Sequence, residues 1–280
     1  MTEQHCRLVN NFIRWGSSSD KLNAALLLGS QARGDNKADE NSDADIVMFV
    51  DDPDYFLVSD EWLHNIGAFH IAFVEDSLDG SKERRVLFDG ALDMDFIVRS
   101  TGTIDNIATD EIVSILSNGY QILVDKIGIQ EKMASLAIRK KAFSIPTEQD
   151  FNNLVNDFWY HCVWTVKKLK RGELWTAKFC LDSYMKWKLL SIAELYMRVK
   201  RGVDYNTWYS GRFLEEWAEQ WIREALSFCF AHYDVKDIQA ALLSTMELFR
   251  SLAVETAGKL GYSYPEKADA YASSWVNQTL

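Results

Sequence analysis

Cysteine and proline are scarce in this sequence of 280 residues, which contains four of the first and three of the second. No CxxC pair occurs, so the sequence indicates neither a zinc site nor a disulfide framework. Widely spaced cysteines are typical of reduced, partly buried thiols, and we therefore expect a cytoplasmic protein. The four positions are Cys6, Cys162, Cys180 and Cys229.

Long apolar runs and an excess of positive charge are also missing. No stretch of 18 apolar residues occurs, and the N-terminal segment lacks a basic start followed by an apolar run. We therefore expect no transmembrane helix, no secretory signal and no membrane partner. The net charge of −11 argues against a nucleic-acid partner, because phosphate would be repelled. An acidic surface suits a cationic small substrate, although it also serves solubility alone.

The first half of the chain alternates between short apolar runs and helical stretches. An Asp89-Gly90 pair between two of the runs indicates a hairpin turn. This mixture predicts a small mixed sheet with helices packed on it. Strands are expected at 22–28, 46–50, 69–74, 85–88, 91–98 and 121–124, and helices at 3–15, 59–66 and 104–117.

From Pro146 onward the apolar residues follow the period of a helix. Thr147 and Asp150 resemble a capping box at the start of the first helix. Further helices are expected at 174–200, 211–229, 235–259 and 265–277. We therefore predict an α+β protein, with a mixed-sheet domain over residues 1–142 and an all-helical bundle over residues 143–280.

Gly29-Ser30, a polar spacer and then Asp43-Ala44-Asp45 form the pattern that carries chemistry. Side chains alternate along a strand, so Asp43 and Asp45 point to the same side. Two carboxylates placed in this way can bind divalent cations, with phosphate oxygens completing the shell. Gly29 lets the backbone approach a phosphate, and Ser30 adds a hydroxyl donor.

A later strand offers a third carboxylate. Within residues 92–98, Asp93 and Asp95 share the side opposite to the apolar residues. Aspartate disfavours strands, so this pair needs a compensating partner such as a metal ion. Gly-Ser and Asp-x-Asp are each common by chance, and only their order, followed by an aspartate-bearing strand, makes the pattern specific.

These segments resemble the polymerase-β-like nucleotidyltransferases, and more closely the aminoglycoside 6-adenylyltransferases, which modify streptomycin. The resemblance spans nearly the whole chain and depends on many short matches in a shared order. They include Leu28-Gly29-Ser30, Asp43-Ala44-Asp45, Asp54-Tyr55-Phe56, Glu61-Trp62, Met94-Asp95, the run from Gly119 to Lys126, Pro146-Thr147, Phe158-Trp159, the run from Glu173 to Asp182, and Gly211-Arg212-Phe213-Leu214.

The resemblance implies transfer of AMP from ATP to a hydroxyl of a cationic aminoglycoside, with release of pyrophosphate. It implies that Asp43, Asp45 and Asp95 hold two Mg²⁺ ions, with Asp93 as the next candidate for the third ligand. Gly29 and Ser30 would then lie against phosphate.

In the helical half, the resemblance points to Lys178 as a phosphate contact. It points to Asp182 as a residue that binds a cationic substrate or deprotonates the attacking hydroxyl. Lys186 and Arg212 are further phosphate candidates. Because Lys178 and Asp182 are four residues apart on a helix, a simple surface ion pair is the alternative.

Two other functions remain open at this point. The acceptor could be a lincosamide, another metabolite, a protein or a tRNA end, although the net charge disfavours a tRNA. The chain could also bind nucleotide without catalysis, which the complete acidic set disfavours. Either a monomer or a homodimer is compatible with the sequence.

Overall fold

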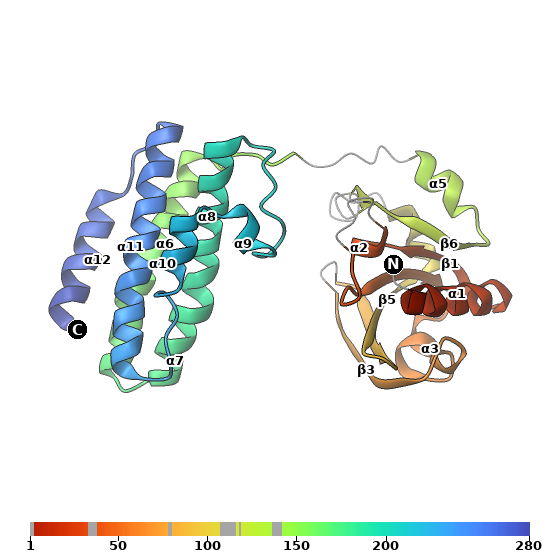
Figure 1. Cartoon of the computed structure of the whole chain (residues 1–280). Coiled ribbons are helices and arrows are strands. Elements are labelled where there is room, and N and C mark those ends of the chain that lie inside the picture. Colours follow the sequence, from red (N-terminus) through yellow and green to blue (C-terminus); the bar gives the residue numbers. More distant parts are fainter. Residues whose placement is uncertain (1–2, 33–37, 78–79, 107–115, 118, 136–141) are drawn as a thin grey trace. The chain divides into compact units, whose positions relative to one another are not determined.

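The computed structural model describes residues 3–32, 38–77, 80–106, 116–117, 119–135 and 142–280 (Figure 1). The chain divides into two compact units, Met1–Lys141 and Ala142–Leu280. The first contains the sheet and the second consists of helices (Figure 1). The predicted α+β class is therefore confirmed.

A six-stranded mixed sheet forms the centre of the first unit. Its strand order is β3-β4-β5-β2-β1-β6, and only β2 and β5 run parallel among the pairs that form it. Each predicted strand is present, and β4 and β5 form the predicted hairpin. The strands are β1 Leu22–Leu27, β2 Ala44–Val50, β3 Phe69–Asp76, β4 Lys82–Phe88, β5 Leu92–Ser100 and β6 Gln121–Asp125.

Helices α1 (Glu3–Ser18) and α3 (Pro53–Val58) bury their apolar residues in the same core as one face of this sheet. At the start of α3, the Asp52 carboxylate accepts a hydrogen bond from the Tyr55 amide. The helix predicted at 59–66 is wrong, because this segment contains only a 3₁₀ turn, Leu63–Asn65. Most of the helix predicted at 104–117 lies outside the described residues.

The second face of the sheet has a smaller core. Ile129 and Met133 of α5 (Ile129–Ser135) pack there with Leu26 of β1 and with Val47 and Phe49 of β2. No described side chain of β3 or β4 belongs to this core. The residues of this core therefore lie mainly over β6, β1 and β2. The metal-ligand candidates on β2 and β5 lie at the edge of this core.

The second unit is built around two long helices, α6 (Glu148–Lys170) and α11 (Val235–Leu260). The predicted capping box is present, because the Thr147 hydroxyl and the Asp150 carboxylate each accept a hydrogen bond from the other residue's amide. Phe158 and Phe249 stack in the core with ring centroids 3.6 Å apart. Among the described helices, none combines the length and apolar character needed to cross a membrane.

Two of the predicted helices are interrupted. The expected helix at 174–200 is divided into α7 (Leu174–Phe179), a π-helical turn (Cys180–Tyr184) and α8 (Met185–Arg201). The expected helix at 211–229 is instead two short helices that follow left-handed backbone at Ser210, Gly211 and Phe213. These are α9 (Leu214–Trp217) and α10 (Gln220–Leu226), and α12 (Glu266–Thr279) ends the bundle.

Glu194 on α8 gives the helical unit a pH-dependent stability. Burial raises the pKa of its carboxyl to about 7, although Arg198 opposes the shift. The folded state therefore binds the proton more tightly than the unfolded state, and stability is lost as the pH rises from about 4.5 to about 7. This shift corresponds to about 3 kcal/mol at most.

We therefore expect Glu194→Gln to raise the thermal unfolding midpoint by several degrees at pH 8 and to leave it unchanged at pH 4.5. Scanning calorimetry at the two pH values measures this. Glu255→Gln, on the exposed surface of α11, is the matched control. Equal shifts at both pH values would contradict the assignment to ionisation.

Candidate active site

Three aspartate side chains converge where β2 and β5 lie side by side. The parallel register places Asp45 directly beside Asp95, and Asp43 comes just before β2. One carboxylate oxygen from each residue lies within 4.8 Å of the other two. The structure therefore brings together the three predicted metal ligands. Asp93 is on the same strand but exposed, and it does not belong to this group.

Burial and neighbouring negative charges raise the proton affinity of Asp45 and Asp95. The pKa of Asp45 rises to about 7, first because of burial and then because of the charges of Asp43 and Asp95. Burial also raises the pKa of Asp95, and the Arg85 guanidinium opposes that rise. Oxygen ligands in this number and at these distances fit a hard divalent cation, which would also relieve the repulsion among them.

Position 29 requires a glycine because its backbone lies very close to the Asp45 side chain. Its φ is +70°, and a Cβ atom built on it would lie 2.0 Å from Oδ2 of Asp45. Only glycine therefore lets the backbone at the start of α2 (Gly29–Ala32) pass beside the metal-ligand candidates. The Leu28 amide, which donates to the Asp45 carbonyl at 2.8 Å, holds the two segments together. The Ser30 side chain lies outside the described part of the chain.

Arg85 is the site residue that sequence analysis missed. In the β4–β5 hairpin it pairs with Asp95, and its Nη2 donates to Asp95 Oδ2 at 2.7 Å. Its Nη1 donates to Glu75 at 2.9 Å, and Glu83 lies 3.6 Å from its Nε. The sequence did not signal this pair, because a two-residue turn at Asp89-Gly90 would place Arg85 opposite Met94. The observed register pairs Phe88 with Leu92, and this shift of one residue brings Arg85 opposite Asp95.

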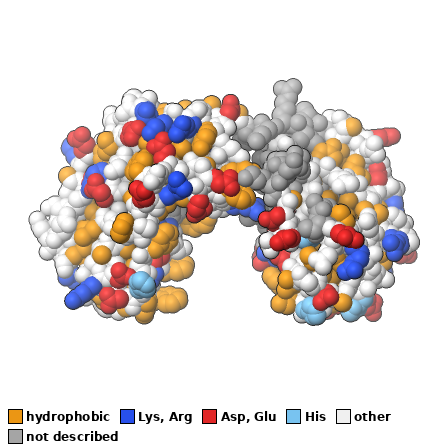
Figure 2. Space-filling view, viewed as in Figure 1, with side chains coloured by type: hydrophobic (Ala, Val, Ile, Leu, Met, Phe, Trp, Pro, Cys, Tyr) orange, Lys and Arg blue, Asp and Glu red, His pale blue; other side chains and the backbone are white. Residues whose placement is uncertain are grey.

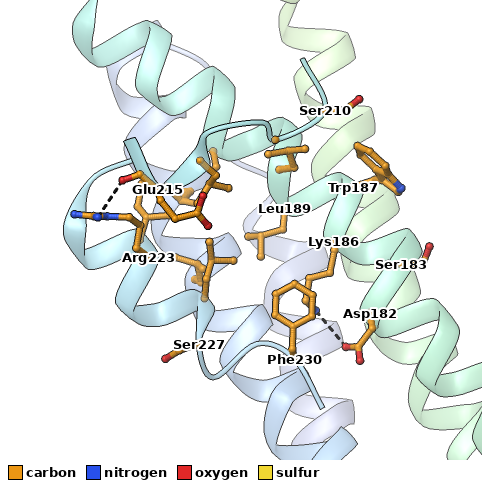
Figure 3. Close-up of a pocket in the computed structure, with 18 residues that line it drawn as sticks. Asp182, Ser183, Lys186, Trp187, Leu189, Ser210, Glu215, Arg223, Ser227 and Phe230 are labelled. Carbon is orange, nitrogen blue, oxygen red and sulfur yellow. Dashed lines mark hydrogen bonds and ion pairs between the residues drawn. The ribbon is translucent and has the colours of Figure 1, made fainter. Parts of the chain in front are cut away.

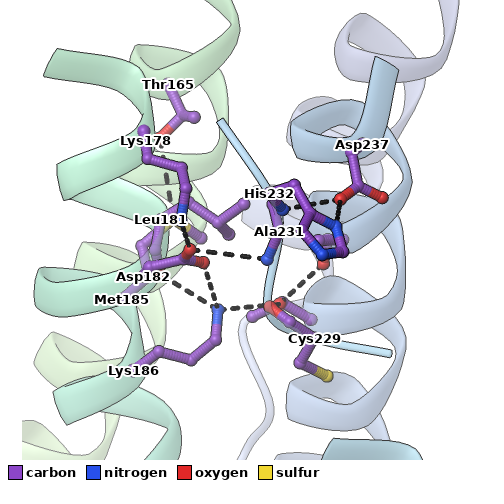
Figure 4. A network of polar contacts seen from close by, with 12 residues as sticks. Thr165, Lys178, Leu181, Asp182, Met185, Lys186, Cys229, Ala231, His232 and Asp237 are labelled. Carbon is purple, nitrogen blue, oxygen red and sulfur yellow. Dashed lines mark hydrogen bonds and ion pairs between the residues drawn. The ribbon is translucent and has the colours of Figure 1, made fainter. Parts of the chain in front are cut away.

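The helical unit holds the other predicted residues. Lys178 and Asp182 form an ion pair, but their side chains are only 23% and 16% exposed, so it is not the simple surface pair of the alternative. The Ala231 amide also donates to Asp182 at 3.4 Å (Figure 4). Asp182 lies on the π-helical turn between α7 and α8. Its other oxygen, Oδ1, is buried without a hydrogen-bond partner. π-Helical turns are frequent at functional sites.

Lys186 faces Asp182 from the next turn, with Nζ 3.8 Å from Oδ1 (Figure 4). Nζ also donates to the Leu181 carbonyl at 3.0 Å and to the Thr245 hydroxyl at 3.1 Å. Burial lowers the pKa of Lys186 to about 8, and Asp182 opposes the shift. Two hydrogen bonds inside the protein thus fix this ammonium beside the Asp182 carboxylate.

Asp182 and Lys186 lie at one side of a cavity of about 640 Å³ within the helical unit (Figure 3). Its wall is largely apolar and includes Leu189 and Phe230, and Glu215 and Arg223 also line it. Arg212 is exposed and is not among the lining residues. The structure therefore gathers Lys178, Asp182 and Lys186 in one group but does not bring Arg212 into it.

An acidic triad on a mixed sheet, with a glycine backbone against it, is typical of the nucleotidyltransferases. The family model described as streptomycin adenylyltransferase matches residues 2–279. The chain therefore belongs to the streptomycin adenylyltransferase family and is an enzyme of the aminoglycoside adenylyltransferase type.

Individual relatives are distant but similar in length. The aminoglycoside 6-adenylyltransferase of Campylobacter jejuni is 23% identical over 260 residues, covering 90% of this chain and 88% of its own. That of Bacillus subtilis (strain 168) is 21% identical over 267 residues, covering 92% of each chain. A crystal structure of an aminoglycoside 6-adenyltransferase from Bacillus subtilis covers 100% of this chain and 98% of its own, at 18% identity and a TM-score of 0.47.

Proposed function

We propose that the protein transfers AMP from ATP to a hydroxyl group of an aminoglycoside, with release of pyrophosphate, and that the acceptor is streptomycin at its 6-position. The observation that carries this proposal is the convergence of Asp43, Asp45 and Asp95 within 4.8 Å. Two Mg²⁺ ions held there would neutralise the triphosphate and stabilise the attacking and leaving oxygens.

The protein's own contribution is positioning. The carboxylates of Asp45 on β2 and of Asp43 just before it meet that of Asp95 on β5. Arg85 fixes the Asp95 carboxylate by a hydrogen bond of 2.7 Å. Phosphoryl transfer depends mainly on such positioning and on electrostatic stabilisation. Gly29 lets the backbone pass close to the Asp45 carboxylate. Gly29 and Ser30 are proposed to lie against the phosphate chain.

In the helical unit we propose that Lys178 contacts phosphate, with Lys186 and Arg212 as further phosphate contacts. Asp182 is proposed to bind a cationic group of the acceptor or to take the proton from its hydroxyl. Its buried Oδ1 accepts no hydrogen bond and lies 3.8 Å from the Lys186 ammonium. This supports a role in binding, because a hydrogen-bond donor of the ligand would satisfy the oxygen.

The test is pyrophosphate release with Mg²⁺ and ATP against a panel of aminoglycosides and lincosamides, with mass spectrometry of each product. We expect adenylylated streptomycin. If only a lincosamide is modified, the proposed acceptor is wrong but the proposed AMP transfer stands. Binding of Mg²⁺ and ATP without any product across the panel would contradict the proposal.

A further inference from the structure

In the described part of the chain, exposed side chains mark the β3 end of the sheet face that carries the aspartate triad. Two large apolar side chains on this face of β3 are exposed, Ile71 to 54% and Phe73 to 47%. On β4, the same face carries Glu83, Arg85 and Leu87, which are half-buried. On the other face of the strand, Arg84, Val86 and Phe88 are buried. Exposed apolar side chains beside a candidate active site are typical of a binding surface.

The strand register connects this surface to the metal-ligand candidates. Phe73 pairs with Arg85, Arg85 with Asp95, and Asp95 with Asp45, so one row of side chains crosses four strands. Neighbouring strands are about 4.8 Å apart, which places Phe73 about 10 Å from Asp95. This separation matches the dimensions of a small molecule with sugar-sized rings.

The surface is acidic despite Arg85. The Arg85 guanidinium lies against three carboxylates, those of Glu75, Glu83 and Asp95, so the group keeps a formal charge of −2 when all are ionised. Burial and the neighbouring Asp95 raise the pKa of Glu83, as expected where negative charges are in excess. Such a surface attracts a cation.

We propose that Ile71, Phe73 and Glu75 bind the cationic acceptor of the transfer reaction. The two apolar side chains lie under a ring face of the acceptor, and the Glu75 carboxylate pairs with one of its positively charged groups. Glu75 suits this role because its side chain is 42% exposed, whereas those of Glu83 and Asp95 are 14% and 7% exposed. The assignment rests on the proposed function and names where on the first unit the acceptor lies.

Glu75→Gln tests the ionic part. We expect the KM for streptomycin to rise about tenfold, as for the loss of one charged hydrogen bond, with the KM for ATP within twofold of the wild type. Calorimetric titration of the nucleotide-free protein with streptomycin should show the same weakening. Asp76→Asn is the matched control, because Asp76 lies on the same strand and points to the opposite face.

Phe73→Ser tests the apolar part, with Val74→Ser on the opposite face of β3 as its control. We expect a rise of about tenfold in the streptomycin KM for the first variant only. Unchanged streptomycin binding in both Phe73→Ser and Glu75→Gln, with an active wild type, overturns the assignment but leaves the proposed function intact. If Phe73→Ser binds streptomycin normally but no longer self-associates, the assignment is also overturned, and the surface is a contact between copies of the chain. A wild type that modifies no acceptor overturns both.

Discussion

Asp45→Asn is expected to lower kcat/KM for AMP transfer by about 10³-fold or more. The amide replaces an anionic ligand of the triad, where the carboxylates of Asp43 and Asp95 are its neighbours. Removing one member of a catalytic group that acts as a unit commonly costs factors of this size. The measurement is pyrophosphate release with labelled ATP, and Asp54→Asn on the exposed surface of α3 is the control.

The same variant separates loss of function from loss of fold. Burial and repulsion raise the pKa of Asp45 to about 7, so ionised Asp45 costs stability above that pH in the metal-free protein. Asp45→Asn should therefore unfold at a higher temperature than the wild type at pH 8 without metal, and the difference should disappear near pH 4. An inactive variant that is also less stable at pH 8 would contradict the assignment.

Magnesium should reverse this order. A cation that binds only the folded state raises its stability in proportion to the logarithm of the cation concentration above its dissociation constant. We therefore expect millimolar Mg²⁺ to raise the unfolding midpoint of the wild type and to have little effect on Asp45→Asn. Asp93→Asn should respond as the wild type does, because Asp93 is exposed and outside the triad.

The triad was predictable from the sequence because its parts depend on local rules. Alternation along β2 placed Asp43 and Asp45 on one side, and the turn at Asp89-Gly90 predicted the hairpin that carries Asp95. The parallel pairing of β2 and β5 was not predictable. Some 40 residues separate the two strands, and no local pattern encodes which strands become neighbours across such a distance.

The helical unit shows the same limit. The i, i+4 spacing predicted the pairing of Lys178 with Asp182, which is a local relation. The π-helical turn that contains Asp182 was missed. One added residue in a helical turn leaves the spacing of the apolar residues almost unchanged. The break between α9 and α10 was also missed, since the backbone there is extended at Ala218 and Glu219, which are residue types that do not signal a break.

Gly29→Ala is the second substitution with a large expected effect. The new methyl group would lie 2.0 Å from Asp45 Oδ2, which is closer than any real contact, so either the carboxylate or the backbone at residue 29 must move. Both movements disturb the triad, and displacements of about 1 Å cost about 100-fold in rate. We expect kcat/KM to fall by at least this factor, measured by pyrophosphate release.

Backbone strain alone must be separated from this clash, because φ at Gly29 is +70°, where alanine is strained. Gly128→Ala is the matched control for backbone strain, since Gly128 has φ +74° and open space where its Cβ would lie. Both variants should lose about 1 kcal/mol of stability from the strained conformation. Only Gly29→Ala should lose activity, together with the stabilisation by Mg²⁺, because only its methyl group reaches Asp45. Equal loss of activity in the two variants would show that strain, and not contact with the triad, explains the glycine.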